Sequence, residues 1–124
     1  MMFNILPAVL VALLGTAAAV GDAAADKVAS LSSLPGWPET ADFDMYSGFI
    51  AVPETTKQIH YVFLESRHDP ATDPTVVWFN GGPGCSSMLG FLQETGPYVL
   101  LDGETTYSAN EYSWNNETNM LYIE

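Results

Sequence analysis

The chain has 124 residues, enough for one domain, and its 3 basic and 15 acidic side chains give a net charge of −12. The basic residues Lys27, Lys57 and Arg67 are scattered, so neither a nucleic-acid partner nor a polybasic membrane patch is predicted. Hydrophobic residues make up 48% and aromatic residues 12% of the chain, which argues against disorder and for a buried core.

The first residues predict entry into the secretory pathway. Residues 5–19 form an apolar run that ends in small residues before Asp22, the pattern of a cleaved signal peptide. We therefore predict a signal peptide over residues 1–21 and no membrane segment after its removal. The alternative is an uncleaved anchor, since a stretch of roughly twenty uncharged residues can span a bilayer. Residues 116–118 form a sequon that predicts N-glycosylation of Asn116 and agrees with this route.

Three strands are predicted in the first part of the mature chain. Residues 22–33 are small and polar and are expected to be a flexible lead-in. The β-prone runs 45–52 and 58–65 flank a polar PETTK segment, which predicts an antiparallel hairpin. Residues 75–79 form a continuous apolar run bounded by turn signals, which predicts a strand buried on both faces.

A short helix and a last strand are predicted in the second part. The helix is expected to begin after a capping serine, Ser86 or Ser87, and to end near residues 96–97. Its apolar residues share one face by i, i+3, i+4 spacing: Met88, Leu89, Phe91 and Leu92. The apolar run 120–123 predicts a strand, which we expect to be an unpaired edge. Since a sheet with buried strands needs helices on both faces, part of the fold is expected to lie outside these residues.

Residues 80–87 (NGGPGCSS) carry the densest functional signal. Three glycines within four positions, between a predicted strand and a predicted helix, expose backbone N–H groups to an anion or an oxyanion. No G-K-[ST] follows and the dinucleotide fingerprint lacks its third glycine, so a phosphate loop is disfavoured. The oxyanion hole of an α/β hydrolase fits better, and a simple connecting turn is the alternative.

A nucleophile or a metal site within the chain is not predicted. The GCSSM segment begins like a nucleophile elbow, but Met88 replaces the closing glycine, so Ser86 is not expected to attack a substrate. Cys85 would need a histidine base. His60 in a predicted strand and His68 in a predicted turn are expected to be ordinary structural or surface residues. Their spacing matches no common zinc site, so neither a metal nor a cofactor is predicted.

The glycine-rich segment leads to a family resemblance. Residues 77–87 (VWFNGGPGCSS) and the following ETGP closely resemble the signature of the serine carboxypeptidases, a family of α/β hydrolases. Other segments match the family in the same order: LPG at 34–36, YSGFI at 46–50, YVFLES at 61–66, YSWN at 112–115 and NMLYIE at 119–124. The resemblance covers residues 34–124 and implies an α/β-hydrolase fold of which only the N-terminal strands and the first helix are present. It also implies that the protein is secreted or directed to the lysosome or vacuole.

The resemblance implies a role for five residues. Gly82 would supply an N–H group of the oxyanion hole. Asn80 and the N–H of Gly81 would bind the free C-terminal carboxylate of a peptide substrate, with Glu94 in the supporting hydrogen-bond network and Trp78 beneath it. An internal peptide bond would leave these donors unpaired, so the resemblance implies removal of C-terminal residues.

The sequence departs from the family in one respect that decides the predicted activity. The family carries its nucleophilic Ser in a G-E-S-Y-A-G segment after the NMLYIE-like strand, and its catalytic Asp and His in later segments. None of these three segments is present in the given sequence. We therefore predict that the chain alone is inactive. The resemblance also makes Cys85 half of a disulfide whose partner is absent from these residues.

Two alternatives to a carboxypeptidase stay open at this point. One is a fragment of a carboxypeptidase-like acyltransferase, because the same fold and triad can transfer the acyl group to an acceptor other than water. The other is a short secreted protein that binds peptides without catalysis. The sequence predicts no oligomeric state.

Overall fold

The structure, a computed structural model, describes residues 23–32 and 35–124. The predicted signal peptide over residues 1–21 lies outside the described residues. Within the described ranges, no helix is long and apolar enough to cross a membrane.

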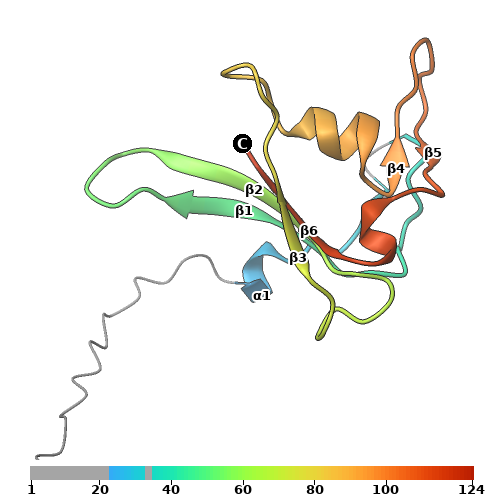
Figure 1. Cartoon of the computed structure of the whole chain (residues 1–124), viewed down its shortest axis with the longest axis horizontal. Helices are drawn as coiled ribbons and strands as arrows, with labels where there is room; N and C mark the ends of the chain where they lie inside the picture. The colour runs from blue at the N-terminus through green and yellow to red at the C-terminus, as the bar shows by residue number, and fades with distance from the viewer. Residues whose placement is uncertain (1–22, 33–34) are drawn as a thin grey trace, which may run out of the picture.

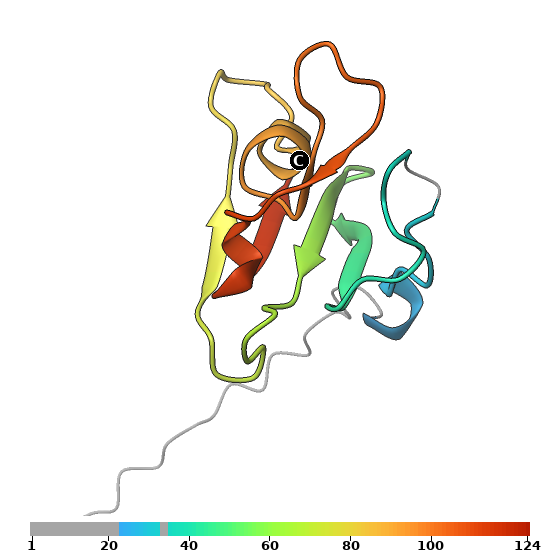
Figure 2. The ribbon, with the colours of Figure 1, turned by 90° about the vertical axis from the view of Figure 1, so that its right-hand side faces the viewer.

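A four-stranded mixed sheet forms the centre of the molecule (Figures 1 and 2). Its strand order is β1-β2-β6-β3, in which β1–β2 and β2–β6 are antiparallel and β3–β6 is parallel. The strand bounds are Met45–Ala51 for β1, Gln58–Leu64 for β2, Thr75–Trp78 for β3 and Asn119–Ile123 for β6.

The predicted hairpin is confirmed. Strands β1 and β2 pair along their whole length, from Met45 opposite Leu64 to Ala51 opposite Gln58. The connecting turn is closed by Thr55, whose Oγ1 donates to the carbonyl of Val52 at 2.9 Å. Alternating β-branched and aromatic residues around a polar turn were therefore sufficient to predict this unit.

Strand β6 is confirmed as a strand, but the prediction that it forms an unpaired edge is wrong. It lies between β2 and β3, with Val62 opposite Tyr122 and Val76 opposite Met120. Tyr122 and Met120 are both 0% exposed. The last strand in the sequence is thus an inner strand of the sheet, which follows from pairing between segments that are distant along the chain.

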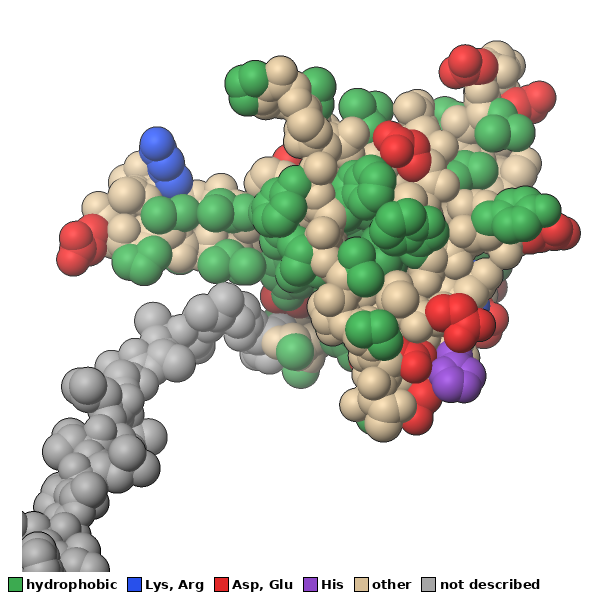
Figure 3. All heavy atoms as spheres, in the orientation of Figure 1, with side chains coloured by type: hydrophobic (Ala, Val, Ile, Leu, Met, Phe, Trp, Pro, Cys, Tyr) green, Lys and Arg blue, Asp and Glu red, His purple; other side chains and the backbone are tan. Residues whose placement is uncertain are grey.

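Strand β3 is confirmed as a strand, but it is not buried on both faces. It is an edge strand in which Val77 is 46% exposed, and Phe79, directly after it, is 66% exposed. Val76 and Trp78 point to the opposite face, where they pack against the core. Figure 3 shows hydrophobic side chains gathered at the front of the molecule around β3 and along the β1–β2 hairpin. An apolar run indicates that the side chains favour burial, but it does not show which elements cover them. The described elements cover only one face of this strand.

One face of the sheet is covered by the elements that follow β3 (Figure 2). They are the π-helical segment η1 (Gly90–Glu94), the short strands β4 (Tyr98–Val99) and β5 (Ser108–Ala109), and the 3-10 turn η2 (Trp114–Asn116). A helical segment follows the glycine-rich loop as predicted, but η1 is shorter than expected. The predicted apolar face is wrong at Leu89, which is 42% exposed, whereas Phe91 is 3% exposed. The form of η1 is a wide turn, with the N–H of Thr95 bonded to the carbonyl of Gly90 at 2.8 Å.

The core beneath η1 is built around an aromatic residue from the proline-rich segment 35–38. The ring of Trp37 lies 5.7 Å from that of Phe91, 4.7 Å from that of Tyr98 and 6.0 Å from that of Tyr107. Gly36 makes this approach possible because a Cβ there would overlap the backbone of Tyr107. This proline-rich segment therefore anchors the β4–β5 arm through Trp37.

The predicted lead-in makes specific contacts in its described part. Helix α1 (Ala23–Asp26) lies beside β1. The hydroxyl of Tyr61 on β2 donates to the Asp26 carboxylate at 2.8 Å. Lys27 forms a β-bridge with Tyr46, and Leu31 is 6% exposed in the core. These contacts differ from those expected of a flexible lead-in, because they tie the segment to the sheet.

Candidate active site

The glycine-rich loop leaves the carboxyl end of β3 and leads directly into η1 (Figure 1). Strands β3 and β6 run parallel, and ligand sites of α/β proteins form beyond the carboxyl ends of such strands. The loop therefore occupies a position at which the fold class favours binding or catalysis.

Two donors determine the orientation of the Asn80 side chain. Trp78 Nε1 donates to Asn80 Oδ1 at 2.8 Å, and the N–H of Gly90 donates to the same oxygen at 3.1 Å. An indole N–H and a backbone N–H can only donate, so the atom between them must be the amide oxygen. Within residues 23–32 and 35–124, no group of the chain accepts a hydrogen bond from Asn80 Nδ2. The amide oxygen of Asn80 is therefore occupied, while its N–H₂ group has no partner among the described residues.

The backbone of Asn80 is held by a buried serine. The N–H of Asn80 donates to Ser87 Oγ at 3.1 Å, and Ser87 is 2% exposed. Ser86 Oγ accepts from the N–H of Met88 at 3.1 Å, but the prediction that Ser86 or Ser87 caps the helix is wrong, because the N-cap of η1 is Leu89 and no side chain bonds there. Ser87 thus closes the loop at its base, a role that sequence reasoning did not assign to it.

The glycines at the tip of the loop are exposed and adopt conformations that disfavour a side chain. Gly82 has φ = 151° and Gly84 has φ = 85°. A Cβ at Gly81 or Gly84 would meet nothing within 4 Å, so the backbone there opens on solvent. Gly81 and Gly82 accordingly lie on an exposed segment, and their roles in carboxylate binding and in an oxyanion hole stay predictions.

Trp78 contacts Asn80 through its indole N–H, and its place beneath a bound carboxylate stays a prediction. Its ring packs edge-to-face against Trp114 of η2, with centroids 5.5 Å apart, and Trp114 is itself 47% exposed. Trp114 belongs to the YSWN segment, which carried the resemblance without an assigned role. Trp114 contacts Trp78 although it lies 36 residues later in the sequence (114 − 78).

Glu94 ends η1, and its side chain is exposed. Its backbone carbonyl accepts a hydrogen bond from Asn110 Nδ2 at 3.2 Å. Among the described residues, no hydrogen bond joins the Glu94 carboxylate to Asn80. Its supporting role in carboxylate binding therefore stays a prediction.

Neither histidine lies in hydrogen-bond contact with the loop thiol or hydroxyls in the described structure. His60 Nε2 lies 3.0 Å from Ser47 Oγ, and His68 pairs with Asp73. Cys85 is a free, exposed thiol. In the part of the chain that the structure describes, no group of three or more His, Cys, Asp or Glu side chains is arranged to hold a metal ion.

The sequon asparagine uses both ends of its side chain. Asn116 Oδ1 accepts from Arg67 at 2.9 Å, and Asn116 Nδ2 donates to the carbonyl of Glu111 at 2.9 Å. Glycosylation of Asn116 stays a prediction.

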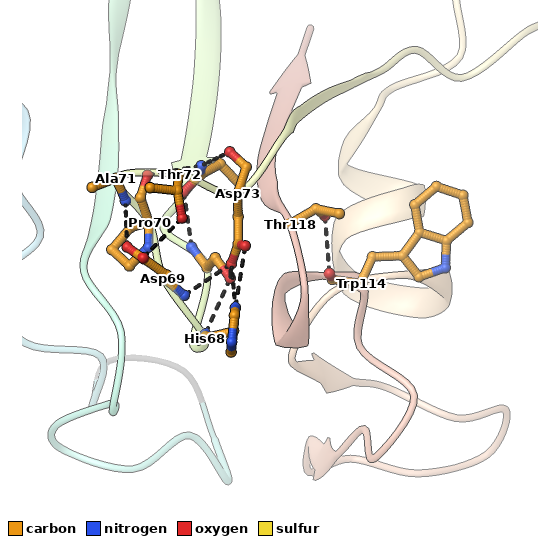
Figure 4. A network of polar contacts seen from close by, with 10 residues as sticks. His68, Asp69, Pro70, Ala71, Thr72, Asp73, Trp114 and Thr118 are labelled. Atoms are coloured by element: carbon orange, nitrogen blue, oxygen red, sulfur yellow. Dashed lines mark hydrogen bonds and ion pairs between the residues drawn. The ribbon is translucent and has the colours of Figure 1, made fainter.

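A second polar cluster lies at the other end of the parallel strands, before β3 begins. Figure 4 shows the His68 side chain pointing toward Asp73. Asp73 accepts from Ser66 Oγ at 2.6 Å, which holds the pKa of its carboxyl below the ordinary 3.8. Its hydrogen bond with His68, at 3.2 Å, raises the pKa of that imidazole above the ordinary 6.5. This cluster pairs its members with one another.

The sequence model of the family described as serine carboxypeptidase matches residues 35–124. This chain belongs to the serine carboxypeptidase family. The match begins with the segment that carries Trp37 and includes the glycine-rich loop, η1 and all four strands of the central sheet. The sequence-based family assignment is therefore confirmed.

Curated relatives of the family agree with the match. The chain is 50% identical over 96 residues to the serine carboxypeptidase ctsa-3.1 of Caenorhabditis elegans, covering 76% of this chain and 17% of that protein. It is 44% identical over 94 residues to the lysosomal protective protein of Mus musculus, covering 76% and 20%. It is 46% identical over 85 residues to carboxypeptidase S1 of Penicillium janthinellum, covering 68% and 20%. The chain thus spans about a fifth of the length of these relatives.

Proposed function

We propose that this chain carries the substrate-recognition half of a serine carboxypeptidase active site, which binds peptides by their free C-terminal carboxylate. The orientation of Asn80 is the observation that carries the proposal. Its oxygen is occupied by Trp78 Nε1 and the Gly90 N–H, so only its N–H₂ group can meet a ligand. A donor at this point selects an acceptor, and a carboxylate is the acceptor that distinguishes a peptide's end from its interior.

The exposed loop supplies the remaining donors. The N–H of Gly81 adds a second hydrogen bond to the carboxylate, and the N–H of Gly82 stabilises the oxygen of the scissile carbonyl as that carbon becomes tetrahedral. Hydrogen bonds to charged groups are worth about 1.5–3 kcal/mol each, more than those to neutral carbonyls. The free acid is therefore bound in preference to its amide. Glu94, which is exposed at the end of η1, is the carboxyl that we assign to the support of this network.

The family chemistry also needs a serine nucleophile, a histidine base and an aspartate, and we assign none of these roles to residues of this chain. The α/β-hydrolase fold and a place in the secretory pathway or lysosome belong to the same proposal. They are supported by the family match and by a relative that is named lysosomal. Acyl transfer and peptide binding without catalysis are not favoured, since the relatives above are named as carboxypeptidases or as a protective protein.

Binding of a matched ligand pair tests the recognition proposal. We expect the chain to bind N-acetyl-Phe-Leu at least about tenfold more tightly than its C-terminal amide, as measured by titration of amide resonances, because one charge-assisted hydrogen bond accounts for that factor. Asn80→Asp keeps an acceptor for Trp78 and Gly90 but turns a carboxylate toward the ligand, so it should abolish the preference. Asn116→Asp adds the same charge away from the loop and should keep it. Equal binding of acid and amide by the wild-type chain would overturn the proposal.

An activity assay tests the catalytic half. We expect residues 22–124 to release no C-terminal amino acid from an N-blocked dipeptide at acidic pH, because the chain offers neither nucleophile nor base at the loop. The Penicillium carboxypeptidase S1 serves as the positive control. Release that a serine-directed inhibitor blocks would contradict the expectation.

A further inference from the structure

We propose that Gly90 is a positioning residue for substrate recognition, which holds Asn80 with its N–H₂ group turned outward. The inference rests on the proposed function and names the residue on which the orientation of Asn80 depends. Gly90 acts through two contacts: its N–H binds Asn80 Oδ1 at 3.1 Å, and its bare Cα lies against the Trp78 indole.

The space at Gly90 explains why a glycine is required. A Cβ there would lie 2.7 Å from both Cδ1 and Cε2 of Trp78, and closer still to Nε1. Such a Cβ cannot coexist with the indole in its present place. Since Nε1 is the other donor to Asn80 Oδ1, any displacement of the ring also removes that hydrogen bond.

The local backbone gives no other reason for a glycine. Gly90 has no left-handed conformation, unlike Gly82 and Gly84. It is the first residue of a helical segment, where alanine is the better former of structure. Glycine at this position is therefore unfavourable for the helix and favourable only for the contact with Trp78.

The carbonyl of Gly90 ties the same peptide segment to the core. It accepts from the N–H of Thr95 at 2.8 Å and from Thr95 Oγ1 at 3.2 Å. Thr95 Oγ1 in turn lies 3.0 Å from the hydroxyl of Tyr122, which is 0% exposed on β6. Burial raises the pKa of Tyr122 to about 12, so this hydroxyl keeps its proton over the physiological range. A continuous set of hydrogen bonds thus leads from an inner strand through Gly90 to Asn80.

Gly90→Ala in the 124-residue chain is the first test, with Gln93→Ala on the exposed side of η1 as the control. We expect Gly90→Ala to shift the indole N–H resonance of Trp78 and both Nδ2 proton resonances of Asn80, and to lower the preference for the free acid of N-acetyl-Phe-Leu about fivefold, the factor for one neutral hydrogen bond. Gln93→Ala should change neither. Unchanged Trp78 and Asn80 resonances in a folded Gly90→Ala chain would overturn the inference.

Hydrogen exchange at Gly90 gives a second test, which needs neither a ligand nor the Gly90→Ala variant. Asn80→Ala removes the acceptor and should speed exchange of the Gly90 amide about fivefold relative to that of Phe91, which is bonded to the Ser87 carbonyl. Asn80→Asp keeps an acceptor and should restore slow exchange. Equal Gly90 exchange in both variants refutes the inference. A wild-type chain without preference for the free acid refutes the proposed function instead, whatever the exchange result.

Discussion

The two ends of the parallel strands β3 and β6 differ in how their polar groups are used. At the amino ends, the groups around Ser66, Asp73 and Asn119 bind one another, and Ser66 and Asn119 are 3% and 4% exposed. At the carboxyl ends, the Asn80 N–H₂ group has no partner among the described residues, and the glycines after it are exposed. The first arrangement stabilises the sheet, and the second provides the donors that the proposed function assigns to a ligand.

We call the amino ends of β3 and β6 the closed end and their carboxyl ends the open end. At the closed end, both side-chain polar atoms of Asn119 have hydrogen-bond partners. Its Oδ1 accepts from the N–H of Ser66 at 2.9 Å, while its Nδ2 donates to the carbonyls of Pro70 and Asp73 at 3.1 and 3.0 Å. Asn80 at the open end uses its oxygen twice and its N–H₂ group not at all within the described residues. The same residue type is therefore structural at one end and free to bind at the other.

The largest effect on stability is expected at the closed end. Asn119→Ala removes a nearly buried side chain that binds the buried N–H of Ser66 and the part-buried carbonyls of Pro70 and Asp73, and should lower the free energy of unfolding by about 2–3 kcal/mol, measured by urea denaturation. Asn110→Ala is the matched control, because Asn110 also makes three hydrogen bonds but is only half-buried. Water can replace its bonds, so a loss of about 1 kcal/mol is expected. Equal losses for the two variants would remove burial as the cause of the difference.

A smaller effect is expected at the base of the open loop. Ser87→Ala removes the buried hydroxyl that accepts from the Asn80 N–H and should cost about 1 kcal/mol of unfolding free energy. It should also speed exchange of the Asn80 amide, which hydrogen-exchange NMR measures. Ser86→Ala, where the hydroxyl is half-exposed, should cost less and leave that amide unchanged. Slow exchange of the Asn80 amide in Ser87→Ala would show that Ser87 does not hold the loop.

The smallest effect is expected from the exposed ion pair of the closed end, and it depends on pH. The folded-state pKa of His68 is raised by Asp73, with Glu117 and Asp69 adding to the rise. The pair therefore stabilises fully below the ordinary value of 6.5 and loses this contribution as the pH rises through the folded-state pKa. The pKa of Asp73 is lowered, so its contribution is present above 3.8 and is lost as the pH falls through the folded-state pKa.

Thermal melting of His68→Gln tests this pH window. At about pH 5 the melting temperature of the variant should lie below that of the wild-type chain, and at about pH 9 the two should be equal. The difference at pH 5 should be smaller than that caused by Ser87→Ala, since the imidazole is 65% exposed and its pairing is screened by water. In an Asp73→Asn background, the pH-dependent effect of the same replacement should be much smaller, because only Glu117 and Asp69 still raise the pKa of His68. A constant difference across the pH range would assign the role of His68 to packing.

Much of the fold could be predicted because its signals are local. The β1–β2 hairpin is encoded by two β-prone runs around a short polar turn, and the helix after the loop by apolar residues at helical spacing. The position of β6 could not be predicted in this way. Its partners in β2 lie more than fifty residues earlier in the sequence. The hydrogen bond between Ser66, just after β2, and Asn119, the first residue of β6, likewise spans 53 residues. The error at β3 has the same origin, because burial depends on what covers a strand.

The sequence by itself determined the family, the hairpin and the residues of the glycine-rich loop, since each is written in consecutive residues with a specific chemistry. Only the tertiary structure decided which end of the Asn80 amide faces outward, because that depends on donors from Trp78 and Gly90. It also decided that Gly90 matters for space rather than for backbone conformation. Hydrogen-bond direction and close packing are properties of neighbours in space, and a linear pattern does not contain them.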